Sequence, residues 1–137
     1  MEINDKLREA VVLLVLEELD RRKLAPIREF ELHQLVRSTQ TVDATLFPYI
    51  NEPIPYSFDL HSFLKGLEKH RYLDELVLMR DGWVPRLEYQ LSPVGRAQAL
   101  EDRELVLALN PNLSSKITEV VDKFASSYKA PAEINPR

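Results

Sequence analysis

The sequence contains no cysteine among its 137 residues and only three glycines. The lack of cysteine excludes disulfide bonds, thiolate metal sites and cysteine nucleophiles. The scarcity of glycine leaves no glycine-rich loop that could cradle a phosphate group, and no P-loop, dinucleotide-binding or G-x-S-x-G pattern occurs. We therefore expect a protein that is not an enzyme, with no catalytic residues and no cofactor.

An excess of positive charge and a long hydrophobic run are also missing. The chain has 18 Lys and Arg residues against 22 Asp and Glu residues, so the formal net charge is −4. A basic coat for nucleic acid is excluded, and any contact with nucleic acid must come from a local patch. The longest apolar run, at 10–16, is too short to span a membrane. We expect a soluble cytoplasmic protein with no membrane contact.

The sequence does not predict a metal site. The three histidines are His33, His61 and His70. The last two lie nine residues apart on one expected helix, which places them on opposite faces at about 3.6 residues per turn. The acidic pairs at 17–18 and 74–75 are adjacent in sequence, so their side chains point apart. We interpret both pairs as surface charge and not as the acid and base of a catalytic site.

Hydrophobic periodicity predicts a single domain over 1–128 and a flexible tail at 129–137. The apolar positions of the first helix cover an arc wider than one packing face, which predicts a central helix or one that touches a second chain. The segment at 40–56 contains three prolines and many apolar residues, so we expect it to be irregular but packed. The helices are expected at about 5–22, 28–39, 57–69, 93–109 and 113–128.

A β-hairpin is predicted between the third and fourth helices. Asp81-Gly82 is a hairpin turn signal between two extended runs. Alternation in the second run predicts that the odd-numbered residues of 87–91 point inward and the even-numbered residues of 86–90 point outward. Pro85 cannot donate to a hydrogen-bond ladder, so this part of the strand should lie at an edge or near the hairpin tip.

The strand changes into a helix within two residues. Ser92 is a good N-cap, and Pro93 suits the first helical position, where the missing N–H costs nothing. Gly95 has no Cβ and permits a neighbouring element to approach closely. We therefore expect the fourth helix to pack tightly against the base of the hairpin.

The order of three helices, a hairpin and a further helix resembles a winged helix, which is a helix-turn-helix with a β wing. The segment "YQLSPVGRAQALE" at 89–101 is similar to the Y-x-L-[ST]-x-x-G signature that closes the wing in PadR-type regulators, through Tyr89, Leu91, Ser92 and Gly95. This resemblance implies an α+β, mostly helical fold with a winged helix of three helices plus a β-hairpin. Two additional C-terminal helices, at about 96–128, extend the predicted winged helix.

Two further segments bear on this resemblance. "FLKGLEKHRYL" at 63–73 looks like a recognition helix entering a wing, although Arg71 replaces the usual glycine. "FPYINEPIPYSFDL" at 47–60 resembles the Y-G-P-[YF]-S-x-x-L segment of the antitoxin-like Panacea domain. Ile54 there stands in place of glycine. The Panacea resemblance implies a protein partner and no DNA binding.

The first functional hypothesis is therefore a transcriptional regulator that binds double-stranded DNA. The third helix would enter the major groove, and wing arginines would reach phosphates. From 57 to 90, five cations face six anions, so a solvated face of mixed charge is an equally good interpretation. The candidate DNA contacts are Arg28, Arg37, His61, Ser62, Lys65, Lys69, Arg80 and Arg86.

The alternative hypothesis is a winged helix that binds a protein partner and no DNA. Its contact surface would be the aromatic, proline-rich segment before the third helix, with Phe47, Tyr49, Ile54 and Tyr56 as contact residues. Under either hypothesis we expect a homodimer formed through the terminal helices, because five helices on a small hairpin leave apolar surface to cover. The first and the fifth helix are both candidates for this interface.

Overall fold

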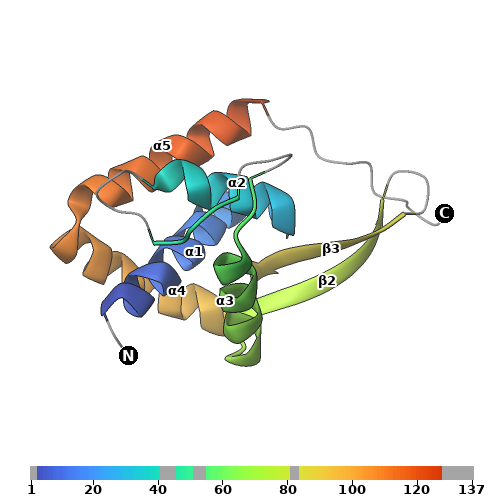
Figure 1. The fold of residues 1–137 in the computed structure, drawn as a ribbon, viewed down its shortest axis with the longest axis horizontal. Coiled ribbons are helices and arrows are strands. Elements are labelled where there is room, and N and C mark those ends of the chain that lie inside the picture. Colours follow the sequence, from blue (N-terminus) through green and yellow to red (C-terminus); the bar gives the residue numbers. More distant parts are fainter. Residues whose placement is uncertain (1–2, 41–45, 51–54, 81–83, 128–137) are drawn as a thin grey trace.

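The computed structural model describes residues 3–40, 46–50, 55–80 and 84–127. The described chain is mostly helical with one small antiparallel sheet, which confirms the expected α+β class. The helices cluster together, and a long hairpin extends away from them (Figure 1). None of the helices in these ranges is long and apolar enough to cross a membrane. The elements are α1 (Ile3–Arg21), β1 (Ile27–Arg28), α2 (Glu29–Thr39), α3 (Phe58–Lys69), β2 (Leu73–Arg80), β3 (Val84–Leu91), α4 (Pro93–Leu109) and α5 (Pro111–Ser127).

Helix α1 is the centre of the hydrophobic core. Every residue from Ala10 to Leu16 is buried. The other helices and β3 surround it, with α4 and α5 packed along its length (Figure 1). Burying a Val or Leu side chain contributes roughly 1.5–3 kcal/mol, so this run is a major source of stability. The central position predicted from the wide apolar arc is confirmed.

Helix α5 presents a single apolar face, and that face is used within the chain. Leu113, Ile117, Val120 and Val121 are buried where α5 packs against α1, α2 and α4. The apolar surfaces of both terminal-helix candidates for a dimer interface are therefore covered inside one copy of the protein. The segment at 129–137, expected to be a tail, lies outside the described residues.

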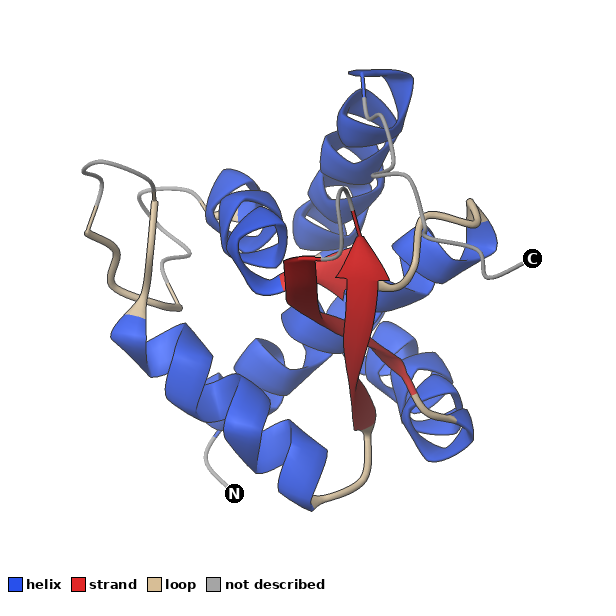
Figure 2. Ribbon diagram, turned by 90° about the vertical axis from the view of Figure 1, so that its right-hand side faces the viewer, coloured by secondary structure: helices blue, strands red, loops and turns tan. Residues whose placement is uncertain are grey.

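The sheet has the order β1-β3-β2, so β3 is its central strand (Figure 2). β2 and β3 form the predicted hairpin, whose expected turn at 81–82 lies outside the described residues. Strand β1 was not predicted from the sequence, and it pairs Ile27 with Tyr89 and Arg28 with Glu88. Pro85 lies on the outer part of the hairpin, opposite Met79, where β3 has only β2 beside it among the described strands. The prediction of a position near the tip is confirmed.

The predicted burial of β3 is wrong at two positions. Leu87 was expected to point into the core but is 49% exposed, and Glu88 was expected to point outward but is buried. Leu87 lies on the outer half of the hairpin, which extends beyond the helices (Figure 1). Glu88 lies opposite Arg28, at the position where β1 pairs with β3. The alternation along the strand is correct, but neighbouring elements decide which side chains are buried.

The junction between β3 and α4 forms as predicted. Ser92 Oγ accepts a hydrogen bond from the Gly95 N–H at 2.9 Å, and Pro93 is the first residue of α4. The Ser92 N–H donates to the carbonyl oxygen of Tyr72 at 3.0 Å. A Cβ on Gly95 would lie 2.0 Å from that same oxygen. Glycine is therefore required here because α4 crosses directly over the backbone at the start of β2.

This contact predicts a large stability loss in Gly95→Ala. We expect the substitution to lower the free energy of unfolding by roughly 1–3 kcal/mol or more, because the Tyr72 backbone must move away. Gly66→Ala is the matched control, since a Cβ at Gly66 would have no neighbouring atom within 4 Å. Alanine there should raise stability by roughly 0.5–1 kcal/mol through helix propensity. Urea denaturation of both variants tests this, and equal stabilities would show that the close approach is absent.

Candidate functional site

The Glu29 carboxylate connects three elements of the fold. It lies at the first position of α2 and accepts hydrogen bonds at Oε2 from His33 Nε2 (3.0 Å) and His61 Nδ1 (2.7 Å). Its Oε1 accepts a third hydrogen bond from the Tyr89 hydroxyl at 3.2 Å. His61 belongs to α3 and Tyr89 to β3, so one side chain fixes α2, α3 and the hairpin relative to one another.

The tautomer of His33 follows from its surroundings. His33 is fully buried, and its Nδ1 accepts a hydrogen bond from the Ser57 backbone N–H at 3.0 Å. The proton of the neutral imidazole must therefore lie on Nε2, which donates to Glu29. The ring of Tyr56 stacks on the His33 ring with centroids 4.5 Å apart, and the Tyr49 hydroxyl donates to the His33 carbonyl oxygen at 2.8 Å. His33 thus fastens the segment before α3 onto α2.

These contacts change the acidity of Glu29. Burial alone would raise its pKa, but the hydrogen bonds that it accepts from His33 and His61 outweigh burial and lower the pKa to about 2. Glu29 therefore stays ionised throughout the neutral range. Its negative charge is a permanent part of the interior between α2, α3 and the hairpin.

Lys65 of α3 is held against the hairpin. Its Nζ lies 3.1 Å from Glu75 Oε2 on β2 and 5.6 Å from the centroid of the Tyr89 ring. The contact with Tyr89 and then the contact with Glu75 raise the pKa of Lys65. Burial raises the pKa of Tyr89 to about 12. Lys65 is therefore charged at neutral pH, but its charge faces a carboxylate of the same chain.

The eight residues proposed to contact DNA do not form one basic surface. Arg28 pairs with Glu31 at 2.8 Å and lies over the Phe30 ring, His61 bonds to Glu29, and Lys65 bonds to Glu75. Arg28 and Arg37 lie at opposite ends of α2. Arg86 is half-buried, and the side chain of Arg80 lies outside what the structure describes. Ser62 and Lys69 are exposed on α3, where they line one shallow hollow with Lys65, Gly66 and Glu68.

The residues proposed to contact a protein partner are mostly engaged within the chain. Phe47 is fully buried, with its ring 5.7 Å from the Phe63 ring and the Arg8 guanidinium 5.0 Å away, so its prediction as a contact residue is wrong. Tyr49 and Tyr56 are half-buried against His33. Ile54 lies outside the described residues. The segment is packed as expected, but it packs on its own domain.

Exposed apolar side chains occur instead on the outer part of the hairpin. Val77 is 65% exposed and pairs across the strands with Leu87. Met79 and Pro85 form the next pair on the same face, and both are exposed. This surface was not predicted from the sequence, because the alternation of apolar and polar residues continues unchanged from the buried base of the hairpin to its exposed end.

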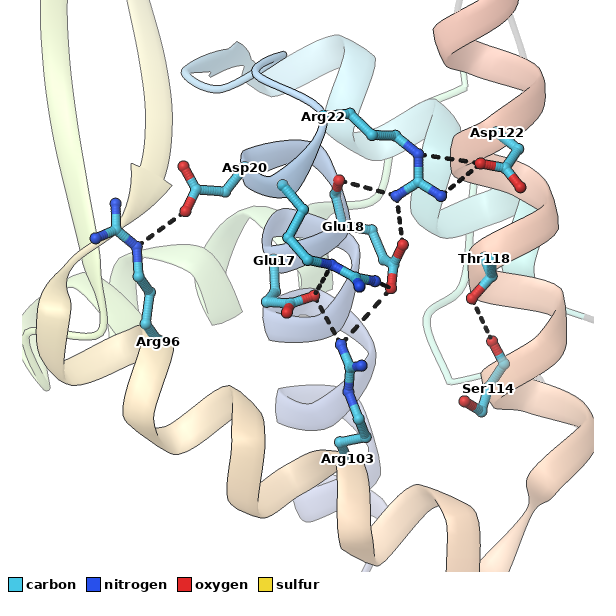
Figure 3. A network of polar contacts seen from close by, with 10 residues as sticks. Glu17, Glu18, Asp20, Arg22, Arg96, Arg103, Ser114, Thr118 and Asp122 are labelled. Atoms are coloured by element: carbon cyan, nitrogen blue, oxygen red, sulfur yellow. Dashed lines mark hydrogen bonds and ion pairs between the residues drawn. The ribbon is translucent and has the colours of Figure 1, made fainter.

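A network of ion pairs joins α1, α4 and α5 at the other side of the molecule (Figure 3). Arg103 Nη2 lies 2.7 Å from Glu17 Oε2, and Arg22 Nε lies 3.0 Å from Asp122 Oδ1. Glu18 is buried and pairs with Arg22. The interpretation of residues 17–18 as surface charge is therefore wrong, because α4 and α5 bring arginine and carboxylate partners to α1. Within the described ranges, no three or more His, Cys, Asp or Glu residues are arranged to hold a metal ion.

A second buried acidic contact joins α1 to α4. Lys6 Nζ lies 2.6 Å from Glu9 Oε2 and 3.1 Å from Asp102 Oδ1, and the Gln98 amide donates to both carboxylates. Glu9 and Asp102 are both buried. Burial and the neighbouring Asp102 raise the pKa of Glu9 to about 7, even though Lys6 opposes the shift.

The acidity of Glu29 predicts a stability loss in acid. Because its folded pKa of about 2 lies below the ordinary value of 4.5, it contributes stability above pH 4.5 that is lost as the pH falls towards 2. The wild type should lose up to about 3 kcal/mol more than Glu29→Gln over this interval. Glu119→Gln, which removes an equal charge from an exposed position, is the control. Parallel stability curves for the wild type and Glu29→Gln would contradict the assignment.

Glu9 predicts the opposite dependence on pH. Its folded pKa of about 7 lies above 4.5, so between these values the folded state keeps a proton that the unfolded state releases. Stability from this group is therefore present below pH 4.5 and falls as the pH rises to 7. Glu9→Gln should remove this fall and be more stable than the wild type at pH 8. Guanidinium denaturation of the wild type and the variant from pH 4.5 to pH 8 measures this dependence on pH. A variant that is less stable than the wild type at pH 8 would refute the raised pKa of Glu9.

Comparisons with models of known protein families, with characterised proteins and with solved structures found no match to this chain. Its function is therefore inferred from its own side chains. Two surfaces are relevant: the face of α3 that carries Ser62 and Lys69, and the outer hairpin that carries Val77 and Leu87. The first is polar with mixed charge, and the second is apolar.

Proposed function

We propose that this chain is a winged-helix domain that recognises another protein through the outer part of its hairpin. The element order supports this proposal, because α1, α2 and α3 precede the hairpin and α3 packs against β2. Strand β1, at the start of α2, pairs with β3 and anchors the hairpin to the helices. The hairpin then extends beyond the helical body, where a second molecule can reach it (Figure 1).

The observation that carries the proposal is the exposed pair Val77 and Leu87. They lie on one face with Met79 and Pro85, so the apolar groups form a continuous ladder along two strands. Contiguous exposed apolar surface is a mark of interaction sites. Covering a Val or Leu side chain is worth roughly 1.5–3 kcal/mol before the costs of association. A partner that covers this ladder gains most of that energy from a few side chains.

The charges favour a protein over DNA as the partner. Attraction to phosphate supplies most of the affinity for DNA. Arg28, His61 and Lys65 each bond to a carboxylate of the same chain, so a phosphate would have to compete with that carboxylate. On the hairpin, the described side chains nearest the tip on the ladder face are Met79 and Pro85, which offer nothing to a phosphate.

The geometry of the sheet indicates how a partner would bind. β2 lies at the outside of the sheet, so its outer backbone edge has no strand beside it among the described residues. Such an edge can accept an extended peptide as an added strand. We propose that the partner contributes an extended segment with apolar side chains at alternate positions. These would contact Val77 and Met79, while backbone hydrogen bonds set the register.

DNA binding by α3 is the second candidate. It is supported by the hollow on α3 where Ser62, Lys65 and Lys69 lie together. The salt dependence of binding separates DNA binding from protein binding. Contact with DNA phosphates releases counterions, so the affinity for DNA falls as the salt concentration rises. Fluorescence anisotropy with mixed-sequence duplex DNA should show no salt-dependent binding from about 20 to 200 mM salt. Binding that falls with salt and is lost in Lys69→Glu would establish DNA binding instead.

The hairpin surface is tested directly with a phage-displayed random-peptide library selected on the purified protein. We expect selected peptides to carry alternating apolar residues. They should bind the Val77→Lys/Leu87→Lys double variant at least tenfold more weakly, a loss of about 1.4 kcal/mol. Ile50→Lys, at a similarly exposed apolar residue away from the hairpin, is the control and should bind normally. Selected peptides that bind the double variant as tightly as the wild type would contradict the proposal.

A further inference from the structure

Helix α4 is apolar on two opposite faces. Its inner face, with Gly95, Ala99 and Val106, packs in the core. On its outer face Leu100 is 60% exposed, and Pro93 and Leu107, seven residues before and after it, are exposed on the same side of the helix. A surface helix normally has one apolar stripe and one polar face. The outer stripe therefore has apolar surface that the described fold does not cover.

We propose that a second copy of this chain covers this stripe, with the two α4 helices antiparallel and Leu100 at the two-fold axis. In such an interface, residue i of one copy contacts residue j of the other, and j contacts i. Residues at equal distances from Leu100 therefore face each other. Leu107 of one copy meets Pro93 of the other, and Ala97 leaves room for close approach. The stripe spans about 21 Å from Pro93 to Leu107 at 1.5 Å per residue.

The charges on this face select the antiparallel arrangement. Arg96 and Glu104 lie four residues before and after Leu100, and both are exposed. Antiparallel packing places Arg96 of each copy beside Glu104 of the other, at both ends of the interface. Parallel packing would instead place the two copies of Glu104 together, and like charges repel. Arg96 Nε already donates to Asp20 at 2.9 Å, but a guanidinium carries further N–H donors that can reach a second carboxylate.

A second copy of this chain fits the outer face of α4 better than a different partner does. The apolar faces of α1 and α5 are buried within the chain, and among the described helices α4 carries most of the exposed large apolar side chains. The charges beside its stripe are complementary to themselves when the helix is reversed. The apolar hairpin ladder is a separate surface, and it stays accessible to the proposed protein partner. One interface through a single helix is small, so we expect dissociation in the micromolar range.

The lack of cysteine provides a direct test by disulfide crosslinking. A thiol introduced by Leu100→Cys would face the same thiol of the other copy at the two-fold axis. A disulfide needs a Cα separation of about 4.4–6.8 Å, which the two helices would reach after small adjustments. We expect rapid formation of a covalent dimer in glutathione redox buffer. Leu107→Cys should not crosslink alone, because its two copies would lie about 21 Å apart. A mixture of Leu107→Cys and Pro93→Cys proteins should form the crosslinked heterodimer. Crosslinking of Leu107→Cys alone would overturn the antiparallel arrangement.

Sedimentation equilibrium tests the same face without added thiols. The wild type should show a monomer–dimer equilibrium, and Leu100→Glu should weaken it at least tenfold while circular dichroism shows an intact fold. Leu87→Glu, on the hairpin, is the matched control and should dimerise normally. A reversed pair, Arg96→Glu/Glu104→Arg, should restore the dimer that Glu104→Arg alone disrupts. A wild type that stays monomeric at millimolar concentration, or a dimer that survives Leu100→Glu, would overturn the proposal.

Discussion

The hydrogen bonds that converge on the Glu29 carboxylate hold α2, α3 and the hairpin together. A half-buried carboxylate is costly unless donors satisfy its oxygens, and here donors arrive from α2, α3 and β3. His33 supplies one of these donors, while its other ring nitrogen accepts the Ser57 amide that starts α3. The position of α3 relative to the hairpin therefore depends on this charge, together with the pair of Lys65 and Glu75. Any surface formed by α3 and the hairpin depends on the same charge.

The local features of this fold could be predicted from sequence because they depend on neighbouring residues. Ser92 caps α4 as expected, Gly95 permits the predicted close approach, and the wide apolar arc of the first helix correctly indicates a central position. β1 was missed because a two-residue strand has no periodicity. The burial of Leu87 and Glu88 was predicted wrongly because alternation gives the period of a strand and not how far neighbouring elements cover each face.

The candidate site could not be predicted because its residues meet only in three dimensions. His61 lies 32 residues from Glu29, and Tyr89 lies 60 residues from it. Helical spacing relates His61 only to His70, but the structure brings His61 to the carboxylate that also holds His33. The same limit applies to Glu17, whose partner Arg103 is 86 residues away. Charges judged to be free on a surface were in fact neutralised inside the fold.

Neutralised cations and exposed apolar groups together support the view of this domain as a protein-binding module. The polar side chains of α2 and α3 hold the fold, and Val77 and Leu87 remain for recognition. Helix α4 adds a second apolar face, away from the hairpin, which we assign to another copy of the chain. The two surfaces lie on different elements, so a dimer can present two hairpins at once.

The central claim is that Glu29 fixes α3 to α2 by orienting His33. Amide hydrogen exchange of the Ser57 N–H tests it most directly, because this amide donates to His33 Nδ1 in the buried interior. In Glu29→Gln, the Ser57 amide should exchange at least tenfold faster than in the wild type, while amides in the middle of α1 keep their protection. An unchanged Ser57 amide, or an equal loss of protection throughout α1, would contradict this account.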